Sequence, residues 1–160
     1  MIRAAYLSAL LSTAILASSS IAGCDGPESS LTLLETGPLG AYATEVQPHV
    51  AERCASGGCH GRADRRLRLY APGHYRADAS RLHLDEPLTQ QELGENARRL
   101  AAFAHGSELE SSELFCKPLA LEAGGCAHGV GEVFVDWTDP TCLALERWLS
   151  GRAPVDGGLP

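Results

Sequence analysis

The stretch CASGGCHG, residues 54–61, places two cysteines and a histidine within seven residues. Four residues separate Cys54 from Cys59, and His60 directly follows the second cysteine. Two glycines lie between the cysteines, where they give the backbone the freedom to form a tight loop. Thiols and an imidazole at this spacing suit three chemistries: covalent haem attachment, zinc binding and a disulfide loop. The fold of the surrounding domain depends on which of them applies.

The three chemistries use the motif differently. In covalent haem attachment, two thiols bond to the porphyrin vinyl groups and the histidine after the second thiol binds the iron, which would use Cys54, Cys59 and His60. The usual haem motif has two residues between its cysteines, so the CxxxxCH spacing is a minority variant. A zinc site needs a fourth ligand from elsewhere in the chain. A Cys54–Cys59 disulfide gives His60 no role.

The N-terminal region is typical of an exported protein. Residues 1–23 have Arg3 as their one charge, then an apolar run and small residues, which predicts a signal peptide. The sequence Ile21-Ala22-Gly23-Cys24 resembles the lipobox of bacterial lipoproteins, which implies that Cys24 is lipidated. Residues 24–40 are rich in glycine, proline and serine and predict a flexible tether. We therefore expect a lipid-anchored protein of the bacterial cell envelope, on its periplasmic or extracellular face.

Export, net charge and the absence of catalytic motifs limit the functions that are expected. Thiols are oxidised in exported proteins, which favours covalent haem or a disulfide over a thiolate zinc site. The chain has 13 basic and 20 acidic residues and a net charge of −7, so nucleic acid is not expected as a partner. The sequence has no recognisable catalytic acid–base pair, Ser/His/Asp arrangement or phosphate-binding loop, so we do not expect an enzyme.

Local patterns predict three helices within a domain at residues 41–151, followed by a disordered tail at 152–160. Apolar residues every four positions predict a helix that leads into Cys54. A capping box at residues 89–92 begins a second helix that should span 90–104, near Gly106. Asp139 and Pro140 begin the last helix, which Gly151 ends. A short extended piece is expected at 67–70 within a loop, and a turn of helix is expected at 111–114.

Three stretches resemble bacterial class I-like cytochrome c domain lipoproteins: VQPHVAERCASGGCHG at 46–61, ELFCKPLALEAGGCAHGVGEVF at 113–134 and DPTCLALERWLSG at 139–151. The resemblance covers roughly residues 41–151. It implies an all-α fold of three to four helices around one covalent haem c, with the first and last helices crossing beside the haem. It also implies single-electron transfer to a redox partner protein in the cell envelope.

The second iron ligand cannot be the methionine that many such proteins use, because the only methionine is Met1, which belongs to the predicted signal peptide. The candidates are the histidines outside the motif: His49, His74, His83, His105 and His128. By analogy with the distal loop of these proteins, the glycine-flanked His128 is the expected ligand. A vacant sixth position would instead give a haem sensor or enzyme. A non-haem structural or binding lipoprotein with a Cys54–Cys59 disulfide is the other alternative.

Three further cysteines remain, Cys116, Cys126 and Cys142, which predicts one disulfide and one free thiol. We expect the pair Cys126–Cys142, because it would fasten the loop that carries His128 to the last helix.

Overall fold

The computed structural model describes residues 38–105, 108–129 and 131–151. The predicted signal peptide, Cys24, most of the tether and the tail at 152–160 lie outside these ranges. Within them, all regular elements are helices, and the one β-type pairing is an isolated parallel bridge between Leu119 and Phe134. This agrees with the predicted all-α class. No helix of the described ranges has both the length and the apolar character needed to cross a membrane.

The first helical segment contains a wide turn. It consists of α1 (Leu39–Ala41), the π-helical turn η1 (Tyr42–Val46) and α2 (Gln47–Arg53). Pro48 has no backbone N–H to donate to the preceding turn, and the π-helical turn directly before α2 accommodates that loss. Because α1 begins at Leu39, the predicted tether, which ends at residue 40, is two residues too long.

The two other long helices begin and end as local signals predict. Helix α3 (Gln90–Phe103) has the expected capping box, in which Thr89 Oγ1 accepts from the Glu92 N–H at 3.2 Å and the Glu92 carboxylate accepts from the Thr89 N–H at 2.9 Å. It stops one residue before the predicted end. Helix α5 (Pro140–Leu149) is capped by Asp139, which accepts from Thr141 N–H at 2.9 Å.

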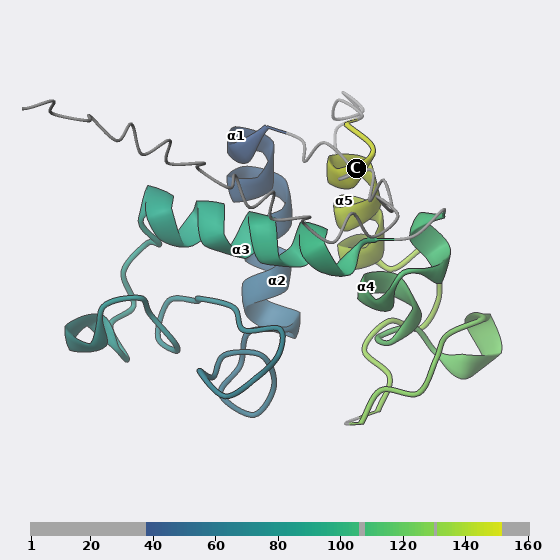
Figure 1. Cartoon of the computed structure of the whole chain (residues 1–160), viewed down its shortest axis with the longest axis horizontal. Coiled ribbons are helices and arrows are strands. Elements are labelled where there is room, and N and C mark those ends of the chain that lie inside the picture. The colour runs from purple at the N-terminus through teal and green to yellow at the C-terminus, as the bar shows by residue number, and fades with distance from the viewer. Residues whose placement is uncertain (1–37, 106–107, 130, 152–160) are drawn as a thin grey trace, which may run out of the picture. The chain divides into compact units, whose positions relative to one another are not determined.

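These helical segments pack around one apolar core. Turn η1 contacts both α3 and α5, and α2 contacts α5 (Figure 1). The Tyr42 and Trp148 rings meet in the core, with centroids 5.0 Å apart. The first and last helical segments therefore lie against each other. The core includes Val46, Val50, Leu93, Leu100, Phe115 and Leu145.

Short helices and irregular chain complete the domain. The short elements are η2 (Ala79–Arg81), η3 (Leu109–Ser111), α4 (Glu113–Cys116) and η4 (Leu121–Ala123). Residues 54–78 are largely irregular, and a buried polar network fixes them to the helices. Asn96 of α3 accepts from Tyr70 N–H and donates to the Tyr70 carbonyl, both at 2.8 Å, and also donates to Gln47 at 3.0 Å. The network therefore fixes the chain at Tyr70, and the CASGGCHG loop is joined to this chain by the bond from Leu69 N–H to the His60 carbonyl at 2.7 Å.

Candidate functional site

The motif forms a compact loop at the end of α2. Cys54 is the C-cap of that helix, and its carbonyl accepts from His60 N–H at 2.9 Å. At Gly61 a Cβ atom would lie 2.1 Å from the Ala55 carbonyl oxygen, so this position accommodates only glycine. The Arg65 side chain donates to two more carbonyls of the loop, those of residues 58 and 59. The loop that separates the two thiols is therefore well held.

Both motif cysteines are free and half-buried. The structure thus lacks the Cys54–Cys59 disulfide of the non-haem alternative. Burial raises the pKa of Cys54 to about 12, which outweighs the opposite effect of Arg53 and keeps the group a thiol. Zinc binds thiolates. Across the described ranges, no group of three or more His, Cys, Asp or Glu side chains is placed to hold a metal ion, so a fourth zinc ligand is not found.

His60 is oriented for metal binding through one defined nitrogen. Its Nδ1 lies 2.8 Å from the Leu67 carbonyl oxygen, which can only accept, so Nδ1 carries the proton and Nε2 has a free lone pair. Burial lowers the His60 pKa; the bond to Leu67 acts in the opposite direction, and nearby His128 lowers it further. A neutral imidazole with one nitrogen fixed by a carbonyl is the usual state of a ligating histidine.

The structure brings His128 to His60. The two rings have centroids 6.1 Å apart and planes inclined by 20°. Two imidazoles on opposite sides of one metal ion have ring centres about 6 Å apart, because each metal–nitrogen bond is about 2 Å and each nitrogen lies about 1 Å from its ring centre. His128 Nδ1 donates to the Gly131 carbonyl at 3.1 Å, which again leaves Nε2 available. The rings are stacked, and it is their separation and their free Nε2 atoms that fit a pair of ligands for one metal ion.

The other four histidine candidates lie away from this pair. His49, His74, His83 and His105 do not line the hollow that contains His60 and His128. Three of them, His74, His83 and His105, are exposed.

The two histidines and both motif thiols line one largely apolar hollow. It has about 910 Å³ of space free of protein atoms, counting the part open to solvent. Helices α2, α3 and α5 each contribute at least one apolar side chain to its lining. Pro118 and Phe134, from irregular parts of the chain, line it as well. The apolar lining is Val50, Leu67, Leu100, Phe103, Leu114, Pro118, Val133, Phe134 and Leu145.

Charged side chains also line the hollow: Arg53, Arg66 and Lys117, with Glu113 as the one acidic group. Glu113 lies between two of the cations, with its Oε2 3.1 Å from Arg66 Nη1 and 3.9 Å from Lys117 Nζ. The Arg66 guanidinium also covers the Phe103 ring, 4.9 Å from its centroid. In a chain of net negative charge, this hollow is positively charged, which suits a ligand that has an apolar body and acidic substituents.

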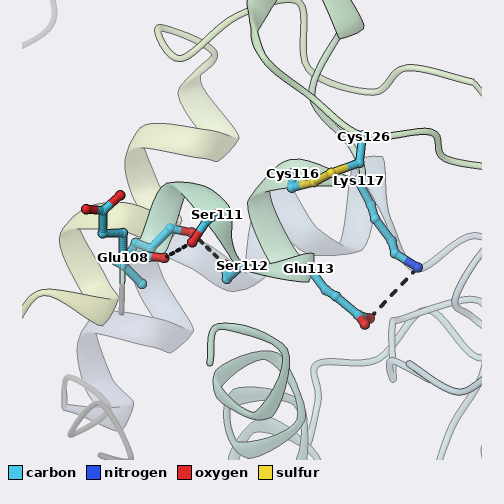
Figure 2. Close-up of a disulfide and its surroundings, with 8 residues drawn as sticks. Glu108, Ser111, Ser112, Glu113, Cys116, Lys117 and Cys126 are labelled. Carbon is cyan, nitrogen blue, oxygen red and sulfur yellow. Dashed lines mark hydrogen bonds and ion pairs between the residues drawn. A yellow bond between two sulfur atoms is a disulfide. The ribbon is translucent and has the colours of Figure 1, made fainter. Parts of the chain in front are cut away.

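A disulfide lies next to the His128 loop, but not the predicted one. Cys126 is bonded to Cys116, with Cα atoms 5.1 Å apart, as Figure 2 shows. The predicted pair Cys126–Cys142 is wrong because Cys142 is buried in α5, with 1 % of its surface exposed, whereas Cys126 lies in an exposed loop. The Cys126 N–H donates to the Cys116 carbonyl at 2.6 Å, which aligns these two residues. The expected outcome of one bridge and one free thiol is confirmed.

Sequence reasoning missed the cations of the hollow. The run RADRRLRL at 62–69, basic in an acidic chain, was a usable signal for Arg66, whereas Lys117 and Arg53 are isolated in sequence. Compared with known proteins, the chain matches no family model, no curated protein and no solved structure.

Proposed function

We propose that this chain is a monohaem c-type cytochrome that carries single electrons. Cys54 and Cys59 attach the porphyrin, and His60 and His128 bind its iron. The observation that carries the proposal is that two imidazoles, at the separation of paired metal ligands, share an apolar hollow with two free thiols. A haem iron needs only two protein ligands, because the porphyrin supplies the other four. The arrangement supports haem better than zinc.

Different side chains of the hollow would hold different parts of the haem. The apolar side chains exclude water from the porphyrin faces, and the free thiols supply the two sulfur atoms of the thioether bonds. Three cations line the hollow and could pair with the acidic substituents of the ring in exchange for their present partners: Arg66 and Lys117 now pair with Glu113, and Arg53 with Asp139 at 3.4 Å. When bound, the haem supplies a one-electron couple between ferric and ferrous iron.

The ligand pair has a consequence for the reduction potential. A methionine ligand raises the potential of a c-type haem. The described ranges contain no methionine, and both proposed ligands are imidazoles. We therefore expect a potential below that of His/Met cytochromes.

The proposed setting is the bacterial cell envelope. The chain would be exported, lipidated at Cys24 and held at a membrane surface on its periplasmic or extracellular face. Its partner would be a redox protein of the same compartment. An electron carrier makes and breaks no substrate bonds, so we do not assign an enzymatic reaction.

The test is an absorption spectrum of the full chain produced in cells that contain haem-attachment machinery. A Soret band and a pyridine haemochrome that remains with the protein after denaturation are expected, because thioether bonds survive unfolding. The Cys54→Ser/Cys59→Ser variant is the control and should lose the bound haem. A colourless wild-type protein would overturn the proposal.

The same preparation tests the ligand assignment. Replacing His128 with alanine should convert the ferric spectrum from low-spin to high-spin, since one strong-field imidazole is lost. The matched control is His105→Ala, because His105 is exposed and outside the hollow. An unchanged spectrum in His128→Ala would refute ligation by His128.

A further inference from the structure

We propose that the Cys116–Cys126 disulfide holds His128 on the iron, and that its reduction by a dithiol releases this loop and opens the sixth coordination position. This inference rests on the proposed function, because it assumes a haem bound between His60 and His128. It adds to that function a thiol-controlled change from an electron carrier to a haem that binds external ligands.

The loop that carries His128 is fastened at both ends to one short stretch of chain, residues 116–118. At its start, Cys126 N–H donates to the Cys116 carbonyl at 2.6 Å, beside the disulfide. At its end, the N–H groups of residues 133 and 134 both donate to the Pro118 carbonyl at 2.8 Å. The disulfide is the one covalent cross-link that the structure shows at this loop base (Figure 2), and Cys126 precedes His128 by two positions in the sequence.

Burial contributes little to the position of the loop. Cys126, Ala127 and Gly129 are exposed, and His128 is only half-buried. The hydrogen bond of His128 Nδ1 goes to Gly131, which belongs to the same loop and so does not fasten the loop to the domain. Segments with few buried contacts open at low free-energy cost. The loop base is also held by hydrogen bonds from Gly125 N–H to the Ala120 carbonyl at 2.9 Å and from Leu121 N–H to Glu132 Oε1 at 3.2 Å, so the disulfide is the covalent cross-link among several restraints on His128.

The disulfide is accessible to a thiol reagent. Cys126 is exposed and Cys116 is half-buried, whereas the remaining free thiol, Cys142, is buried in α5. In the exchange, a thiolate of the dithiol attacks one sulfur, the Sγ–Sγ bond breaks, and the second thiol of the reagent resolves the mixed disulfide. Two electrons and two protons pass to the protein, giving two cysteine thiols, and the dithiol leaves as a disulfide.

The size of the effect follows from loop closure. The disulfide joins residues ten positions apart. By the chain-entropy relation, removing a cross-link of this length favours the released loop by up to about 100-fold. Release of the loop lowers the effective concentration of the His128 imidazole at the iron by the same factor. An external ligand that competes with His128 should therefore bind at a concentration lower by up to about 100-fold.

The experiment is a cyanide titration of the ferric, haem-loaded full chain, followed by the shift of the Soret band. The Cys116→Ser/Cys126→Ser variant is expected to reach half-saturation at least about tenfold, and up to about 100-fold, below the cyanide concentration that the wild type needs. Cys142→Ser is the matched control, because it removes a thiol but leaves the disulfide, and its midpoint should equal that of the wild type. Half-saturation of the double variant within threefold of the wild type would overturn the inference.

A second measurement covers the case in which the double variant does not fold. Wild-type protein is treated with a dithiol, its new thiols are alkylated, and the iron is reoxidised with ferricyanide before the same titration. The thioether bonds to Cys54 and Cys59 are not reducible by thiols, so haem is retained. If the disulfide had only a structural role, its reduction would lower the melting temperature and leave the cyanide midpoint unchanged. A wild type without haem would instead refute the proposed function itself.

Discussion

The acid sensitivity of the fold should depend on one buried carboxylate, Glu92 of α3. Its side chain is 2 % exposed, and it accepts five hydrogen bonds: two from the Arg76 guanidinium, one from Ala77 N–H, and two from Thr89, through its N–H and its hydroxyl. Arg76 also donates to the carbonyls of residues 86 and 87. This cluster joins the irregular chain before α3 to the first turn of that helix.

The pKa of Glu92 gives the magnitude. Burial by itself would raise it, but the hydrogen bonds from Arg76, Thr89 and Ala77 outweigh burial and lower the pKa from 4.5 to about 2. A difference of about 2.5 units between the unfolded and folded chain corresponds to about 3 kcal/mol of stability, which is fully present above the unfolded pKa. It is lost as the pH falls through the folded value, and about 2 kcal/mol is gone by pH 3.

The assay is urea unfolding of wild type and Glu92→Gln at pH 7 and pH 3, followed by far-ultraviolet circular dichroism. Glu92→Gln should be about 3–5 kcal/mol less stable at pH 7, because it leaves a buried guanidinium without its charge partner. The difference from wild type should shrink by about 2 kcal/mol at pH 3, since the variant lacks the titrating group. Effects of acid on the histidines cancel in this comparison.

Glu95→Gln is the matched control. Glu95 lies on the same helix and pairs with Arg98 and Arg99, but these ion pairs are at the surface, with a side-chain exposure of 29 % for Glu95 and 67 % for Arg98. Surface pairs of this kind contribute about 0–1 kcal/mol, so the pH 7 and pH 3 differences should agree within that range. If Glu92→Gln also shows the same difference from wild type at both pH values, the reasoning about the buried carboxylate is refuted.

Three substitutions test other contacts. Gly61→Ala places a Cβ 2.1 Å from a carbonyl of the motif loop, so on the proposed function the haem content per protein should fall severalfold. Gly57→Ala has open space around its new Cβ and should have the haem content of the wild type. Equal haem contents in the two variants would contradict the loop geometry. In the histidine loop, the Cβ of Gly125→Ala would lie 2.0 Å from a carbonyl oxygen, so this variant should lower the free energy of unfolding in urea by about 2 kcal/mol or more. Gly129→Ala should lower it by less than about 0.5 kcal/mol, and a larger loss in Gly129→Ala than in Gly125→Ala would refute the assigned loop geometry. Asn96→Ala leaves the buried Tyr70 N–H without its partner and should cost about 1–3 kcal/mol in the same assay; a loss under about 0.5 kcal/mol would show that the network is not needed.

Local signals account for the part of the fold that the sequence predicted. The ends of α3 and α5 depend on side chains one to three residues away, a capping box and an Asp-Pro pair, so they can be read without knowledge of the tertiary structure. The helix that leads into Cys54 follows from its apolar period. The π-helical turn at Tyr42–Val46 was not predicted, although Pro48 was a local warning that the helix could not be regular there.

The parts that the sequence did not predict depend on non-local packing. Which cysteine pairs with Cys126 depends on where α4 and α5 place their side chains, and the choice between Cys116 and Cys142 has no local signal. The cation cluster has the same origin, because Arg66 and Lys117 are 51 positions apart and meet only through Glu113. The choice of His128 came from a resemblance rather than from chain geometry, and no calculation on the sequence alone gives its 6.1 Å separation from His60.

The two histidines of the site are held by different means, and this difference predicts where the site can change. His60 follows a helix end, its loop is fixed by backbone bonds and by Arg65, and its imidazole is bonded to a carbonyl of another segment. His128 lies in an exposed, glycine-rich loop whose imidazole bonds only within that loop. On the proposed function, the bond from His60 to the iron should persist under conditions that break the bond from His128. Exogenous ligands and dithiols should therefore both act first on the His128 side of the haem.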